Sequence, residues 1–291
     1  MGTFMKNNCH QSSMHWRALK KSAGISLRLL MTVWYCLPAV VAGAQPDSAV
    51  FKWPPGKKAA LSLSFDDARE SQVLSGTALL DSYGIKATFF VVPSSVEKRL
   101  EGWKKAVANG HEIGNHSVNH PCSGNFYWSR NNALEDYTLK RMKAELAECN
   151  KRVEALLGIK PEVFAYPCGQ KYVGTGRRTK SYVPLVSKMF LLGRGWRDEA
   201  ANDPVHCNFF QLTGVEMDNK DFNEILPLLQ EATKKGQWLL LAGHEMADSG
   251  EQTTRLAMLT ELAKYVQDPA NGIWIAPVGT VARYINQHGG K

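Results

Sequence analysis

Residues 87–92 read ATFFVV, a continuous run of apolar and β-branched side chains. Such a run is typical of a strand that is buried on both faces, as in a parallel sheet covered by helices. Similar short apolar runs occur at residues 60–65, 163–166, 238–242 and 273–276. Because predicted helices separate them, the sequence predicts an α/β fold with a mainly parallel sheet, either open or closed into a barrel.

Weaker patterns complete this prediction. Further strands are expected at residues 111–114, 189–192 and 209–212, and helices at 103–109, 139–156, 222–235 and 253–266. Another helical stretch reaches Tyr83, where Gly84 is a stop signal. In α/β folds of this kind the functional site lies at the carboxyl ends of the strands.

The first 44 residues differ from the rest. They carry five Lys or Arg and no acidic residue, followed by an apolar run at 29–41 and the small residues Ala42-Gly43-Ala44. This order predicts a cleaved secretory signal peptide, because the apolar run is short for a membrane-spanning helix of about 20 residues. We therefore expect a protein that is secreted, periplasmic or in the cell envelope, without a membrane span after cleavage. Residues 45–57 form a leader, and 58–291 one catalytic domain.

Removing residues 1–44 changes the composition. The whole chain of 291 residues has a net charge of +8 and six cysteines. The remaining 247 residues hold 30 Lys and Arg against 27 Asp and Glu, hence +3, and four cysteines. This length fits one barrel-sized domain. A mildly basic domain without a Lys/Arg-rich run interleaved with aromatics argues against a nucleic-acid partner. The sequence sets no oligomeric state.

Polar residues collect at the predicted strand ends. Asp66 and Asp67 follow one strand directly, His116 and His120 are four residues apart, and His244 follows the run at 239–243. Adjacent carboxylates repel each other unless a cation or a shared proton relieves them. On one helical turn, two histidines at this spacing would point the same way, which suits a divalent metal. Two histidines and a carboxylate predict a hydrolytic zinc site.

Each of these features also has an ordinary structural interpretation. An Asp-Asp pair after a strand is commonly a turn or a helix cap. An isolated H-x-x-x-H is a weak metal signal, and a single histidine such as His244 is commonly a capping or buried residue. The conjunction of all three signals at strand ends favours a functional site.

The same segments resemble the motifs of polysaccharide deacetylases of carbohydrate esterase family 4, which share the NodB homology domain. The matching stretches are LSFDD at 63–67, GIKATFF at 84–90, GHEIGNHSVNHP at 110–121, FAYPCG at 164–169 and LLAGH at 240–244. The resemblance extends from about residue 58 to 285. It implies a distorted (β/α) barrel with fewer than eight regular strands. It also implies hydrolytic removal of N-acetyl groups from an acetylated polysaccharide or oligosaccharide containing N-acetylglucosamine, such as chitin, peptidoglycan or an exopolysaccharide.

The resemblance implies a role for each matching residue. Asp66 would be the general base, and His244 the general acid that protonates the leaving amine. The ligands of a divalent metal, Zn²⁺ by preference, would be Asp67, His116 and His120. The backbone N–H of Cys168 would hold the oxyanion, with Pro167 and Tyr166 beside it at the substrate.

The chain also departs from the family pattern. Ala68 stands in place of a Gly, Ala165 in place of an Arg that usually orients the base, and Cys168 in place of an aromatic residue. The Asp-Trp pair of the fourth motif is not evident, and residues 192–198 are the nearest stretch. Arg194 or Arg197 is therefore a candidate substitute for the Arg. Asp198 is a candidate to orient His244, with a surface Asp as the alternative.

Two alternative functions stay open, the second because of the missing Arg and the altered fourth motif. One keeps the metal site but changes the bond, to O-acetyl esters of xylan or a small C–N substrate. The other is an inactive homologue that binds glycans.

Aromatic residues follow the histidine pair at 126–128, ending in Trp128, and Trp196 lies further along the chain. Their rings could stack on sugar faces in a glycan groove, or simply pack the loop down.

Four cysteines remain after cleavage, which allows three complete disulfide pairings. Cys149 lies on the buried face of a predicted helix and is expected to act as a small apolar residue. Cys122, Cys168 and Cys207 lie in predicted loops or at strand ends. A bridge from Cys122 or Cys168 at the site's rim is possible, without a preferred partner.

Overall fold

The structure is a computed structural model that describes residues 51–289. The predicted signal peptide at 1–44 lies outside the described residues, as does the predicted leader as far as residue 50. The described residues form one compact unit. Among the residues described, no helix has the length and apolar character that a membrane span requires.

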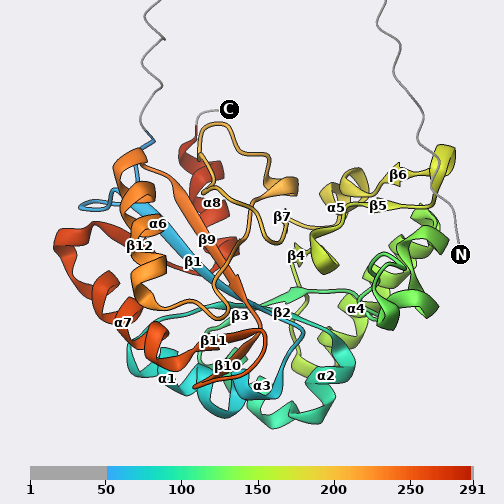
Figure 1. The fold of residues 1–291 in the computed structure, drawn as a ribbon, viewed down its shortest axis with the longest axis horizontal. Coiled ribbons are helices and arrows are strands. Elements are labelled where there is room, and N and C mark those ends of the chain that lie inside the picture. The colour runs from blue at the N-terminus through green and yellow to red at the C-terminus, as the bar shows by residue number, and fades with distance from the viewer. Residues whose placement is uncertain (1–50, 290–291) are drawn as a thin grey trace, which may run out of the picture. The chain divides into compact units, whose positions relative to one another are not determined.

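A parallel sheet of eight strands forms the centre of this unit (Figure 1). Seven strands lie in the order β7 (Leu192–Arg194), β4 (Val163–Ala165), β3 (Glu112–Asn115), β2 (Thr88–Val91), β1 (Ala59–Asp66), β9 (Trp238–Gly243) and β8 (Val215–Glu216). The eighth, β12 (Ile273–Ile275), also pairs with β1. Every pairing in this sheet is parallel, as the ATFFVV stretch predicts.

Strand β1 holds the sheet together because it has three partners. It pairs with β9 over six residues, with β12 at its start, and with β2 at its end. All eight of its residues are buried. The register places Phe65 opposite Gly243, so the next residue of each segment, Asp66 at the end of β1 and His244 just after β9, lies at the same edge.

Helices surround the sheet (Figure 1). They are α1 (Thr77–Ser82), α2 (Pro93–Lys98), α3 (Leu100–Ala108), α4 (Leu139–Leu157), α5 (Val183–Met189), α6 (Phe222–Lys235), α7 (Leu256–Gln267) and α8 (Val278–His288). The largest apolar cluster joins β1 and β2 to the inner faces of α3, α4, α6 and α7. Smaller two-stranded pairs are β5 (Tyr172–Val173) with β6 (Lys180–Ser181), and β10 (Glu245–Ala247) with β11 (Thr253–Arg255). The predicted fold class, a distorted (β/α) barrel of mainly parallel strands, is confirmed.

Two predicted strands and one predicted helix are wrong in detail. Around residues 189–192 the chain is helical up to Met189, and the strand is Leu192–Arg194. At 209–212 a 3₁₀ turn, Phe209–Gln211, precedes the true strand Val215–Glu216. The helix expected from residue 253 begins at Leu256, after the short strand β11. Short apolar runs carry too little periodicity to separate a helix from a strand.

Candidate active site

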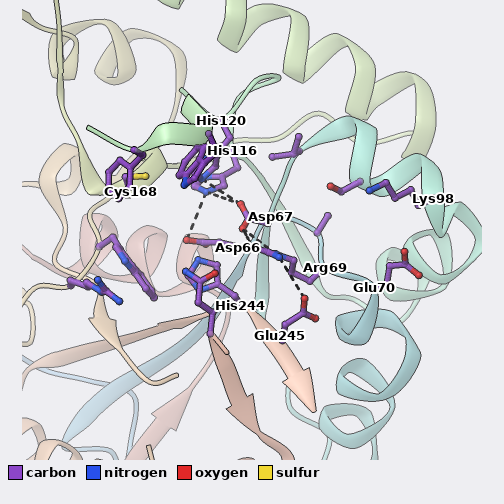
Figure 2. Close-up of a pocket in the computed structure, with 18 residues that line it drawn as sticks. Asp66, Asp67, Arg69, Glu70, Lys98, His116, His120, Cys168, His244 and Glu245 are labelled. Atoms are coloured by element: carbon purple, nitrogen blue, oxygen red, sulfur yellow. Dashed lines mark hydrogen bonds and ion pairs between the residues drawn. The ribbon is translucent and has the colours of Figure 1, made fainter. Parts of the chain in front are cut away.

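The candidate site lies where the parallel strands end. Asp66 ends β1, His116 follows β3, Arg194 ends β7, and His244 follows β9. A cavity of about 960 Å³ opens here, and Figure 2 shows its side chains. The predicted residues that line it are Asp66, Asp67, His116, His120, Cys168, Trp128, Trp196, Arg197 and His244. Tertiary structure thus brings most of the predicted residues to one place.

Asp67, His116 and His120 converge on one point. The Nε2 atoms of His116 and His120 lie 3.6 Å and 3.4 Å from Oδ1 of Asp67, and the three donor atoms are all within 4.8 Å of one another. The Nδ1 atom of His116 is 2.9 Å from the carbonyl oxygen of Ala165. This contact turns the other ring nitrogen toward Asp67, as a supporting hydrogen bond does in metal sites. The donor set fits a divalent metal such as Zn²⁺.

The electrostatics of these side chains suit metal binding. Burial alone raises the pKa of the Asp67 carboxyl, but the charges of His120 and His116 lower it to about 2. Burial, assisted by His116, lowers the pKa of His120 to about 4. At neutral pH Asp67 is therefore ionised and His120 neutral, which are the forms that bind metal ions.

The two histidines do not share a helical turn, contrary to the expectation from their spacing. Residues 116–120 form a loop in which Ser117 and His120 have positive φ angles of 65° and 47°. The loop is held by Glu145 of α4, whose carboxylate accepts hydrogen bonds from the backbone N–H groups of Val118 and Asn119. The loop therefore brings the two imidazoles together, although the spacing predicted a helical turn.

Asp66 is buried and forms an ion pair with Arg194. Arg194 is fully buried, and its guanidinium also lies over the ring of Phe90 at 4.9 Å. In the parallel pairing of β4 with β7, Arg194 lies directly opposite Ala165. The guanidinium that the family supplies at the position of Ala165 therefore comes here from the neighbouring strand.

Arg197 and Asp198 do not take the supporting roles predicted for them. Arg197 is exposed and pairs with Glu216 at 3.0 Å, so it does not replace the missing Arg. The carboxylate of Asp198 accepts a hydrogen bond from the backbone N–H of Gly214 at 2.9 Å. The suggestion that Asp198 orients His244 is wrong, because another carboxylate occupies that place.

That carboxylate belongs to Asp218, which the sequence reasoning missed. Its Oδ2 lies 2.7 Å from Nδ1 of His244, and its Oδ1 accepts from the hydroxyl of Thr254 at 2.7 Å. Burial alone lowers the pKa of His244, but the hydrogen bond with Asp218 and the charges of Asp66 and Asp67 raise it above its usual value. The signal in the sequence was the Asp of VEMD at 215–218, just beyond a short strand.

A second missed residue, Gln72, joins the two halves of the site. This fully buried side chain donates to the backbone carbonyl of Asp66 at 2.7 Å and to that of His244 at 2.8 Å. One amide group thus fixes the distance between the ends of β1 and β9, and so between the side chains that follow them.

The turn after β4 differs in part from its prediction. Cys168 has a positive φ of 53°, lines the cavity and forms a disulfide with Cys122. Pro167 is buried beside it. Tyr166 was expected at the substrate, but it lies in the core, where its hydroxyl donates to the carbonyl of Phe210 at 2.8 Å. Side chains alternate along an extended chain, so Tyr166 faces away from the cavity.

Aromatic rings form one wall of the cavity. Trp128 is 59% exposed, and its ring lies 5.7 Å from that of His120 and 5.4 Å from that of Phe126. On the other side, the ring of Trp196 packs edge-on against His244 at 4.7 Å. Tyr127 is 82% exposed and stacks with Arg130 at 5.2 Å. Phe126 and Trp128 thus present apolar ring faces next to the predicted metal ligands.

This arrangement, a buried carboxylate beside a His-His-Asp set with an Asp-His pair opposite, holds in one α/β barrel the groups that a hydrolytic reaction requires. Comparison with known proteins shows which family the chain is similar to. Residues 54–182 match the profile of the family described as "Polysaccharide deacetylase", so the resemblance seen in the motifs is confirmed.

Individual relatives match parts of the chain. The chain is 35% identical over 91 residues to "Uncharacterized protein YlxY" of Bacillus subtilis (strain 168), which is 31% of this chain and 25% of that protein. It is 40% identical over 62 residues to "Peptidoglycan-N-acetylglucosamine deacetylase PgdA" of Listeria monocytogenes serotype 1/2a (strain 10403S), which is 21% of this chain and 13% of that protein. Both alignments thus span a quarter or less of the relative.

The fold is also that of known structures. A "probable Polysaccharide deacetylase" from Pseudomonas aeruginosa PAO1 superposes with a TM-score of 0.57 at 16% identity, over 82% of this chain and 95% of that one. At this identity the likeness concerns the fold alone.

Proposed function

We propose that this protein is a metal-dependent polysaccharide deacetylase that removes N-acetyl groups from a glycan containing N-acetylglucosamine. The observation that carries the proposal is the meeting of three units at one cavity: the Asp66–Arg194 pair, the Asp67–His116–His120 set, and the His244–Asp218 pair. Hydrolysis of an amide needs a base, a group that stabilises the oxyanion, and an acid for the leaving amine.

Each unit has a part in this reaction. Asp67, His116 and His120 would hold a divalent cation, Zn²⁺ by preference, which when bound polarises the acetyl carbonyl and makes water more acidic. Asp66 accepts the proton of the attacking water, and the buried Arg194 keeps its carboxylate in place. The backbone N–H of Cys168 donates to the developing oxyanion. His244, held by Asp218, gives its proton to the leaving nitrogen.

The raised pKa of His244 supports its role as the acid. A histidine with a pKa above its usual value keeps its proton further into the neutral range, whereas Asp67 and His120 are in their metal-binding forms there. Groups in one site whose environments push their pKa values apart are a mark of divided acid and base roles.

The surroundings support an extracytoplasmic glycan as substrate. The open cavity and the rings of Phe126 and Trp128 fit a sugar chain, whose apolar faces stack on aromatic rings. The disulfide between Cys122 and Cys168 fits an oxidising compartment, and so supports secretion to the periplasm, the cell envelope or beyond.

Acetate release from N-acetylglucosamine oligomers tests the proposal, with chelator and with Zn²⁺ added back. Chelation should stop the release and Zn²⁺ restore it. Asp66→Asn should lower kcat by about 10²- to 10⁴-fold while the bound metal, measured by elemental analysis, is retained. Asp198→Asn, which changes a carboxylate outside the three units, is the matched control and should stay close to the unmodified enzyme.

The same assay separates the alternatives. Faster release from acetylxylan than from N-acetyl oligomers would replace the amide substrate by an ester. A protein that binds oligosaccharides but contains no metal and releases no acetate from chitin, peptidoglycan or acetylxylan would be an inactive binding homologue, and the proposal would fail.

A further inference from the structure

The disulfide between Cys122 and Cys168 joins two loops of the candidate site. Cys122 follows the histidine loop and is fully buried, whereas Cys168 stands at the turn after β4 and lines the cavity. Their positions in the chain are 46 residues apart. The bridge therefore ties the loop that carries His120 to the turn that carries the oxyanion N–H.

His120 lies between this bridge and the carboxylate side of the site. Its Nε2 is 3.4 Å from Oδ1 of Asp67, and its Nδ1 is 3.7 Å from Sγ of Cys122. A neutral imidazole binds a metal through one nitrogen while the other carries a proton. His120 can therefore serve a metal on the Asp67 side or one on the sulfur side, but not both in its neutral form.

The sulfur side has the composition of a metal site. The donor atoms of His120, Cys122 and Cys168 lie within 4.8 Å of one another, a clustering that meets the same limit as that of Asp67, His116 and His120. While the disulfide is intact, neither sulfur is a thiolate, the form that binds metal. Reduction would turn both sulfurs into potential ligands on residues whose Cα atoms lie 6.0 Å apart.

We propose that reduction of the Cys122–Cys168 disulfide creates a thiolate–imidazole metal site that takes His120 away from the Asp67–His116 side. Two thiolates bring two negative charges, whereas Asp67 and His116 together bring one. Thiolates are also the softer ligands and bind Zn²⁺-like ions tightly. Arg69 further weakens the carboxylate side, because its guanidinium donates to Asp67 at 3.0 Å and 3.2 Å (Figure 2).

The chemistry of the switch is balanced. A dithiol reductant supplies two electrons and two protons: the S–S bond breaks, two S–H bonds form, and the reductant closes its own disulfide. Metal binding then displaces both thiol protons to solvent. The oxidised protein keeps His120 for the Asp67–His116 side. The consequence for catalysis, loss of activity on reduction, rests on the proposed function; the metal site itself does not.

Cobalt(II) absorption tests the site directly, because a thiolate ligand gives a strong sulfur-to-cobalt charge-transfer band. The full chain is prepared oxidised, or reduced with a phosphine. The phosphine takes oxygen from water to become a phosphine oxide as the two thiols form, and it is removed before one equivalent of Co²⁺ is added. We expect the band in the reduced protein and none in the oxidised protein.

The control is Cys122→Ser/Cys168→Ser, which retains Cys9, Cys36, Cys149 and Cys207 and so reports any binding by them. It should show no band in either state. The comparison of oxidised with reduced wild-type protein needs no substitution, so a variant that fails to fold does not remove the test. A reduced protein without the band, or a band of equal strength in the double variant, would overturn the proposal. So would a band that appears only with the second equivalent of Co²⁺.

Acetate release measured on the same samples separates this inference from the proposed function. Loss of activity on reduction together with the band supports both. Absence of acetate release in every state, with the band present in the reduced protein, would refute the proposed function and leave the thiolate site standing.

Discussion

Arg194 and Asp66 are 128 residues apart in the chain and form a buried ion pair where β7 and β1 end. The family resemblance implied an Arg at position 165, and the parallel register places Arg194 opposite that very residue. A guanidinium on the adjacent strand can thus pair with the same carboxylate. The departure at Ala165 is therefore compensated within the site.

The Arg194–Asp66 pair predicts a specific pattern in a double-mutant cycle. Arg194→Met leaves a buried carboxylate without its partner and should lower the free energy of unfolding by about 3–5 kcal/mol. The double variant Arg194→Met/Asp66→Asn removes the charge as well and should recover part of that loss without recovering activity. Denaturant unfolding measures the free energy of unfolding of each variant, and acetate release measures its activity. Arg197→Met, at the exposed pair with Glu216, should change stability by less than about 1 kcal/mol, and an equal loss there would contradict the assignment.

The Asp218–His244 contact predicts a shift in the pH profile. Asp218 raises the pKa of His244, so Asp218→Asn should lower that pKa. Because the acid acts in its protonated form, the fall of kcat on the alkaline side should then begin at a lower pH. Profiles of kcat against pH on an N-acetyl oligomer check this. Asp198→Asn is the matched control, and a shift of the same size in that variant would count against the role of Asp218.

Metal binding predicts a change in thermal stability that does not depend on catalysis. A ligand at a hundred times its Kd stabilises the folded state by about 2.7 kcal/mol, which for a domain of this size raises Tm by roughly 5–10 °C. Zn²⁺ should produce such a rise in the chelator-treated oxidised protein, but much less of it in Asp67→Asn or His120→Ala. His288→Ala, which changes an exposed histidine on α8, should keep the full rise. A rise of Tm that is as large in Asp67→Asn as in the unmodified protein would show that the metal binds at another site.

The exposed ring of Trp128 predicts an effect on substrate binding. Trp128→Ala should raise KM for N-acetylglucosamine oligomers by about two- to tenfold, the value of one aromatic stacking contact, with kcat changed little. Tyr127→Ala offers a close control, because Tyr127 is the adjacent residue and even more exposed but stacks on Arg130. Steady-state kinetics on oligomers of increasing length would measure KM in both variants. Equal effects of the two substitutions would argue against a stacking site at Trp128.

Much of the site was open to prediction because its residues are local signals at strand ends. Asp66, Asp67 and His244 follow apolar runs whose strands the sequence marks clearly, and parallel strands carry such residues to one edge. The sequence did not predict Asp218 and Gln72, because Asp218 lies just beyond a strand of two residues and Gln72 lies in a short π-helical turn. Neither has a periodic pattern, and their partners lie 26 and 172 residues away.

The amino-acid sequence by itself determined the alternation of strands and helices, the parallel sheet and the motif residues, because each depends on side chains close together in the chain. Only the tertiary structure decided which of two arginines meets Asp66, which Asp holds His244, which cysteines join, and that Tyr166 belongs to the core. Those choices depend on strand register and on the path of loops, which are set by contacts between distant residues. The physical reason is the same in every case: a pairing across the fold is chosen by where the backbone places two side chains, and no local pattern records it.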